Sequence, residues 1–138
     1  MLLYSGPGRQ AVSVQERLAM IWQRLQTFYQ NNHSESRLSN LHLSMILPDT
    51  DSPHKHYPAL KAKASETKHL VGFMVDLIKA TYDGSLQAMN KLQAAQAIHE
   101  FCSLLDSSGP VPTDHEAVKA RQTMNLFLSN YMALQSWA

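Results

Sequence analysis

The chain has 138 residues, with 12 basic and 11 acidic side chains and a formal net charge of +1. This length suits one domain, in which folding buries roughly two-thirds of the surface of the unfolded chain. The near-neutral charge argues against a dedicated nucleic-acid or anionic-membrane binder, and no apolar run approaches the roughly 18 residues of a membrane span. The single cysteine, Cys102, excludes an internal disulfide framework and fits a reducing compartment, so we expect an intracellular, cytoplasmic protein.

The charge density is low. Charged residues make up 17% of the chain, whereas an average soluble domain has about 25%. Low charge density and a net charge near zero leave little repulsion between molecules. The composition therefore favours self-association or a permanent partner.

The first predicted helix follows an irregular lead-in, residues 1–12, that Gly and Pro interrupt. Ser13-Val14-Gln15-Glu16 has the form of a capping box, in which serine and glutamate satisfy each other's backbone N–H groups. Apolar residues then recur at steps of three and four up to Tyr29. This spacing predicts a helix over 14–31, which opens a helical domain over 13–138.

The segment after this helix is ambiguous. Leu38, Leu41 and Met45 suit a helix, whereas Leu41, Leu43 and Met45 alternate as in a strand. A lone strand has no evident partner, so a short helix over 36–46 is the preferred interpretation. The two prolines of the following stretch, residues 48–53, indicate a loop.

A long apolar helix is predicted over 58–83. Pro58 suits its first turn, and Asp83-Gly84 suits its end because glycine adopts the left-handed cap conformation. Between Leu70 and Ile78 the residues are apolar nearly all round the helix, which is typical of a central helix buried on more than one side.

Two further helices complete the predicted fold. The break at residues 107–112 separates a helix over 86–106 from one over 114–137, and Thr113 to Glu116 repeats the capping-box form. No internal repeat, heptad tract or low-complexity segment appears. The expected fold is all-α: a single-domain helical bundle of four long helices and one short helix. The residues expected in the core are Trp22, Leu25, Leu70, Met74, Ile98, Phe101, Phe127 and Tyr131.

The histidines do not indicate a metal site. Glu66 and His69 have the spacing used in di-iron bundles, but no other glutamate is followed by a histidine three residues later. His54-Lys55-His56, near Asp49 and Asp51, reads as a solvated loop rather than a weak metal site. We expect neither metal nor cofactor.

No catalytic residue stands out. Cys102 lies on the apolar side of its predicted helix, where a buried, inert thiol is favoured over a thiol activated by His99 one turn earlier. The chain has no nucleophile elbow, dinucleotide fingerprint or phosphate loop. A non-enzymatic protein is favoured, with an enzyme left open.

A basic cluster surrounds the start of the predicted helix 58–83. Its members are Lys55, Lys61, Lys63 and Lys68. Cations near a helix N-terminus oppose the helix dipole, and a bound phosphate or acidic group would relieve this cost. Neutralisation by Asp49 and Asp51 is the favoured interpretation, and a weak anion-binding site is the alternative.

The last helix carries more apolar residues than one core-facing side can hold. The candidates for an interface are Leu126, Leu128, Leu134 and Trp137. Our leading hypothesis is a non-enzymatic helical protein-interaction or structural module, self-associating or part of a larger assembly. The alternatives are a small nucleic-acid-associated or anion-binding helical protein that uses the lysine cluster, and a compact monomer in which these helices are simply central.

Overall fold

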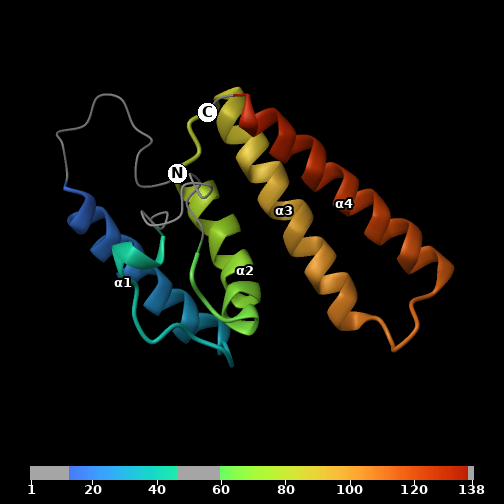
Figure 1. Cartoon of the computed structure of the whole chain (residues 1–138), viewed down its shortest axis with the longest axis horizontal. Helices are drawn as coiled ribbons and strands as arrows, with labels where there is room; N and C mark the ends of the chain where they lie inside the picture. The colour runs from blue at the N-terminus through green and yellow to red at the C-terminus, as the bar shows by residue number, and fades with distance from the viewer. Residues whose placement is uncertain (1–12, 47–59, 137–138) are drawn as a thin grey trace, which may run out of the picture. The chain divides into compact units, whose positions relative to one another are not determined.

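The computed structural model describes residues 13–46 and 60–136, and Figure 1 shows its helices. They are α1 (Val14–Asn32), the short 3₁₀ helix η1 (Leu43–Met45), α2 (Ala64–Ala80), α3 (Leu86–Ser107) and α4 (Asp114–Gln135). The described residues are 75% helical and contain no strand, which confirms the predicted all-α class. The predicted lead-in over 1–12 lies outside the described residues.

The chain forms two compact units, Met1–His69 and Leu70–Ala138, whose boundary falls within α2. In the first unit, α1 begins as its sequence predicts. The Ser13 N–H donates to Glu16 Oε2 at 2.8 Å, and the Glu16 N–H donates to Ser13 Oγ at 3.2 Å. The helix ends at His33, whose left-handed backbone (φ 48°) lets its N–H donate to the Tyr29 carbonyl.

The segment that follows α1 is held by Tyr29, which is 1% exposed. The Leu38 N–H donates to the Tyr29 hydroxyl at 3.1 Å. The Arg37 guanidinium lies 5.8 Å from the centre of the Tyr29 ring and donates to the carbonyls of Ser34 and Tyr29. These contacts fix residues 34–38 without a helix.

The short helix predicted over 36–46 is therefore wrong over most of its length. Residues 34–42 are not helical, and the Leu38 N–H donates to a side chain of α1. Only the single 3₁₀ turn of η1 remains, and the Met45 carbonyl that ends it accepts from the Lys61 N–H at 2.8 Å. Leu38, 5% exposed, contributes to the core.

Helix α2 begins at Ala64, later than the predicted residue 58. The Lys61 N–H donates to the Met45 carbonyl. The Lys63 N–H donates to the Glu66 carboxylate, which acts as a capping group for the start of the helix. Pro58 lies outside the described residues. The predicted burial on more than one side is confirmed, because the buried residues occupy more than half of the helix circumference: Leu70, Phe73, Val75, Leu77 and Ile78.

In the second unit, the turn between α2 and α3 is built by Asp83, Gly84 and Ser85. Gly84 has a φ of 79°, which favours glycine, and Asp83 Oδ1 accepts from the Ser85 N–H at 2.9 Å. The hydrogen bonds from Ser85 lower the pKa of Asp83. Ser85 Oγ in turn accepts from the Ala88 N–H and caps α3. The helix predicted to reach residue 83 thus stops at Ala80, because this turn uses the residues that follow.

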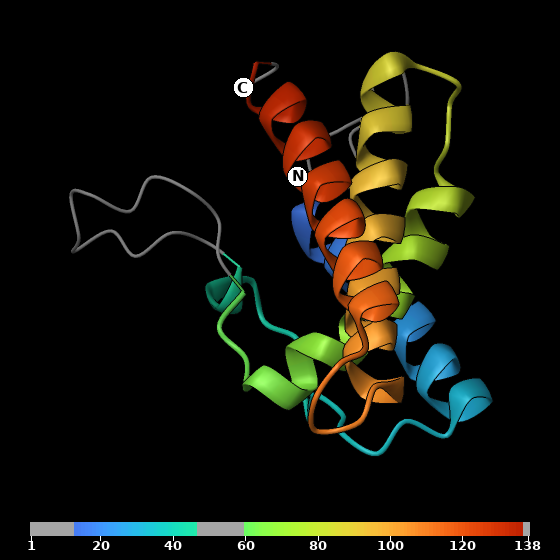
Figure 2. The same ribbon diagram turned by 90° about the vertical axis from the view of Figure 1, so that its right-hand side faces the viewer.

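Helices α3 and α4 lie side by side in antiparallel directions, as Figures 1 and 2 both show. The predicted capping box starts α4: the Thr113 N–H donates to Glu116 Oε2 at 2.7 Å, and the Glu116 N–H donates to Thr113 Oγ1 at 3.2 Å. The observed bounds of both helices agree with the predicted ranges to within one or two residues.

The predicted core is correct in part. Leu25 and Leu70 are buried, and four others are half-buried: Trp22, Ile98, Phe101 and Phe127. The predictions that Met74 and Tyr131 are buried are wrong, because their exposed fractions are 36% and 49%. Met74 lies on the part of α2 that stays open, and the exposure of Tyr131 follows from the way α4 faces α3.

We predict that Tyr29→Phe destabilises the chain by about 1–3 kcal/mol, because the buried Leu38 N–H loses its acceptor. The free energy of unfolding is measured by urea titration. Tyr82→Phe removes the hydroxyl of a tyrosine that is 46% exposed, and it should change stability by less than about 0.5 kcal/mol. Equal effects of the two substitutions would contradict the role of Tyr29.

Candidate functional site

The contact between α3 and α4, which we call the seam, is lined by small and polar side chains. The buried residues are Asn90, Ala94 and Ala97 on α3, and Thr123 and Asn130 on α4. Half-buried residues continue each row at steps of three and four, and they are Gln87, Phe101, Leu104, Glu116, Ala120, Phe127 and Leu134. These steps are the heptad spacing of paired helices. The apolar pattern of the sequence does not reveal this spacing, because most seam positions carry no large apolar residue.

One ion pair marks the register of the seam. Lys119 Nζ lies 3.2 Å from Glu100 Oε1, and both side chains are about half exposed. Such an exposed pair contributes little stability. From this pair, steps of three on α3 and four on α4 reach Ala97 and Thr123, and steps of ten and eleven reach Asn90 and Asn130, so small and polar residues occupy similar levels of the two helices.

The buried polar groups of α4 are satisfied within their own helix. Asn130 Nδ2 donates to the Leu126 carbonyl at 2.9 Å, and Thr123 Oγ1 donates to the Ala120 carbonyl at 3.0 Å. Every fully buried side-chain nitrogen or oxygen in the described part of the chain has a partner. The polar seam is therefore compatible with burial and carries no unpaired group.

The seam takes Phe127 and Leu134 together with the smaller residues of α4, and the other large apolar residues in the second half of the helix point outward. Leu128, Tyr131 and Met132 are 46%, 49% and 68% exposed. Steps of three and four place them on one face of the helix, together with the half-buried Met124. We call these four residues the outer stripe. The Tyr131 ring stacks on Phe127, with ring centres 5.9 Å apart, which ties the stripe to the seam.

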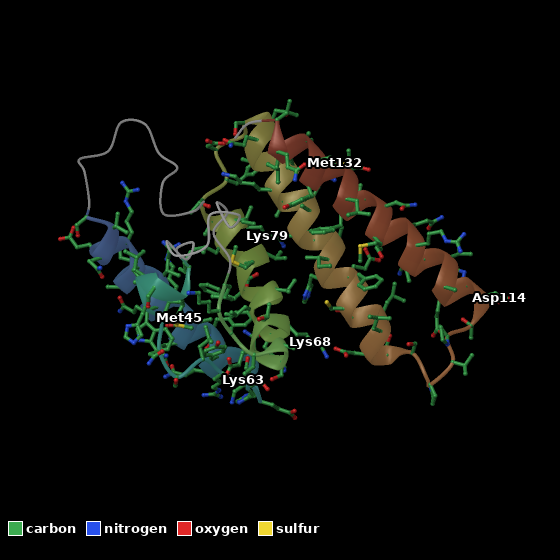
Figure 3. The ribbon with its side chains drawn as sticks, in the orientation of Figure 1. Met45, Lys63, Lys68, Lys79, Asp114 and Met132 are labelled. Atoms are coloured by element: carbon green, nitrogen blue, oxygen red, sulfur yellow. The ribbon has the colours of Figure 1, made fainter. Side chains whose placement is uncertain are left out.

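Charge is unevenly distributed along the α3–α4 pair. Residues 122–135 of α4 contain no Lys, Arg, Asp or Glu, and residues 86–99 of α3, which lie beside them, contain only Lys91. We call this half the open end. The charged residues gather in the half next to the connecting turn, and Figure 3 shows Asp114 and Met132 at opposite ends of α4. The outer stripe is thus an exposed apolar face without charge.

The residues predicted for an interface do not share one face. Leu126 and Leu128 are both exposed, but two residues correspond to about 200° around a helix, so they lie on different sides of α4. Leu134 is half-buried on the seam, and Trp137 lies outside the described residues. The structure adds Tyr131 and Met132, whose apolar spacing pointed to the core. The signal that would have placed them outside is the row of small and polar residues on α4, which are Ala120, Thr123 and Asn130.

Three of the four lysines of the predicted cluster lie at the start of α2. Lys61, Lys63 and Lys68 are exposed, and Lys55 lies outside the described residues. Lys61 and Lys63 precede α2, whereas Lys68 lies on the helix, and Figure 3 labels Lys63 and Lys68. The Glu66 carboxylate takes the Lys63 N–H and places a negative charge at the N-terminus of the helix.

The other sequence candidates remain separate. Across residues 13–46 and 60–136, no three His, Cys, Asp or Glu side chains converge as metal ligands would. Cys102 is half-buried on α3, while His99, one turn earlier, is exposed. Of the helices described, none is both long enough and apolar enough to cross a membrane.

Comparison with known proteins gives no relative: the chain matches no family model, no curated protein and no solved structure. The surface itself is the basis on which its function is inferred.

We predict that Ala97→Leu costs about 1–3 kcal/mol of stability, because Ala97 is 2% exposed and the seam has no room for a larger side chain. Ala117→Leu is the matched control on an exposed position of α4 and should change stability by less than about 0.5 kcal/mol. Urea unfolding of both variants measures the difference. An Ala97→Leu protein as stable as the parent would show that α3 and α4 do not pack through this seam.

Proposed function

We propose that the chain is a non-enzymatic helical protein-interaction module that binds its partner through the outer stripe. The observation that supports this proposal is the exposure of Leu128, Tyr131 and Met132 on one uncharged face of α4. An apolar face on a monomer is unfavourable in water, and larger faces of this kind usually mark contact sites.

The hydrophobic free energy favours covering the outer stripe with a partner over leaving it exposed to water. Burying a large apolar side chain completely contributes about 1.5–3 kcal/mol, and the three exposed residues are already half covered. Tyr and Met are among the residues enriched at interfaces. Burial of these three side chains supplies only part of the roughly 4–15 kcal/mol that association costs, so the partner must contribute apolar side chains of its own.

The alternative, a nucleic-acid-associated or anion-binding protein, depends on Lys61, Lys63 and Lys68. At the start of α2 the Glu66 carboxylate already places a negative charge beside these lysines, which weakens their attraction for an anion. Binding through these lysines would weaken steeply with salt, whereas binding through the outer stripe would not. For location we propose the cytoplasm, on the basis of the single cysteine.

The proposal is tested by affinity purification of the tagged chain from the cells that express it naturally. The double variant Leu128→Ser/Met132→Ser removes the apolar side chains of the stripe and leaves the seam unchanged. We expect it to lose at least about tenfold of the recovered partner, a second copy of the chain included. Circular dichroism confirms that the helices remain.

Val118→Ser is the matched control, because Val118 is 54% exposed on α4 but lies about 15 Å along the helix from Leu128, near the connecting turn. It should recover the partner as the parent does. No recovered partner for any version, or equal recovery by all three, would contradict the proposal. Loss of binding through Lys61→Ala/Lys63→Ala instead would support the nucleic-acid alternative.

A further inference from the structure

We infer that the Asp83-Gly84 pair, in the turn between α2 and α3, is a modification site at which isoaspartate forms, and that Ser85 restrains the reaction. An aspartate followed by glycine is the sequence that isomerises most readily, because glycine has no Cβ to hinder attack by its nitrogen. Among the aspartates of residues 13–46 and 60–136, Asp83 alone precedes a glycine and alone lies outside a helix. The inference is independent of the proposed function, because it does not involve the outer stripe.

The reaction is an isomerisation that needs only water. The Gly84 nitrogen attacks Cγ of the protonated Asp83 side chain, an N–C bond forms, and a carboxyl oxygen leaves as water, which produces a five-membered succinimide. The step is intramolecular and so avoids the entropy cost of bringing two molecules together. Water then adds to the main-chain carbonyl carbon of Asp83 and opens the ring there. The backbone now runs through the former side chain, with one additional carbon, a free α-carboxylate and an unchanged mass.

The turn leaves the reacting atoms accessible. Gly84 has a φ of 79°, and no atom lies within 4 Å of the place where a Cβ would stand, so this side of the residue is open. Asp83 is exposed, and the Gly84 N–H makes no hydrogen bond with any described residue. By contrast, Asp76 and Asp106 lie inside α2 and α3, where the following N–H group belongs to the helical hydrogen-bond ladder.

Ser85 opposes the reaction by holding the turn from both sides. Its N–H donates to Asp83 Oδ1 at 2.9 Å, and its Oγ accepts from the Ala88 N–H at 3.1 Å, which fixes the start of α3. The hydrogen bonds from Ser85 also lower the pKa of Asp83, so the carboxyl group stays ionised, whereas ring closure requires the protonated form. Isoaspartate therefore forms when the first turn of α3 frays.

Modification changes the turn permanently. The additional backbone carbon moves the oxygen that accepts from the Ser85 N–H into the main chain and displaces Ser85 from its capping position. The free α-carboxylate is the group that isoaspartate carboxyl methyltransferases esterify, by transferring a methyl group from S-adenosylmethionine and releasing S-adenosylhomocysteine. The turn is thus a substrate for this class of repair enzyme once the molecule has aged.

Methylation by such an enzyme with radiolabelled S-adenosylmethionine measures isoaspartate after the purified chain has been incubated at physiological temperature and pH. We expect the label to increase with incubation time and peptide mapping to place it at residue 83. Asp83→Glu keeps the carboxylate but cannot form the five-membered ring, so this variant should incorporate at least about tenfold less label.

Ser85→Ala tests the restraint. Without the serine hydroxyl the turn opens more often, and isoaspartate should form at least about threefold faster than in the parent. Ser13→Ala is the matched control, because it removes the capping serine of α1 instead, and its rate should stay within about twofold of the parent.

Three results would overturn the inference. One is label in the parent that does not exceed the label in Asp83→Glu, and another is label that maps mainly to a residue other than 83. The third is a Ser85→Ala protein that reacts no faster than the Ser13→Ala control.

Discussion

The close packing of α3 against α4 through small and polar residues determines the surface of the second unit. Ala94, Ala97 and Thr123 allow the two backbones to approach, and Asn130 satisfies its amide on its own helix. A helix has only one side to offer to a seam, so the side chains of Leu128 and Met132 are left facing water. The exposed apolar face is therefore a consequence of what fills the seam.

The first unit depends on a different constraint, the side chain of Tyr29. Its hydroxyl accepts from the Leu38 N–H, and its ring carries the Arg37 guanidinium. Apolar periodicity around Leu38 and Leu41 suggests a helix, but the segment is not helical and is held against α1 by the buried side chain of Tyr29. The hydrogen bond between Tyr29 and Leu38 joins residues that are close in sequence, but the pattern of apolar positions alone does not predict it.

The features that could be predicted from the sequence are those that depend on residues close together in the chain. The capping boxes at Ser13 and Thr113 fixed the starts of α1 and α4, because a cap needs only four consecutive residues. The face that each helix buries is decided by its partner. From its spacing, Tyr131 was therefore expected in the core. The expected interface included both Leu126 and Leu128, although these two residues lie on different sides of α4. The last helix was identified as the interface candidate, but the stripe emerged only when the seam was known.

The orientation of α4 is tested most directly by thiol reactivity at two neighbouring positions in a Cys102→Ser background, at protein concentrations low enough to keep the chain monomeric. Leu128 is 46% exposed and Asn130 is 6% exposed, so Leu128→Cys should react with a maleimide at a rate close to that of a free thiol. Asn130→Cys should react at least about tenfold more slowly, because access requires the seam to open. Fast reaction at residue 130 and protection at residue 128 would show that α4 presents the opposite side to α3, and the interaction surface proposed here would not exist.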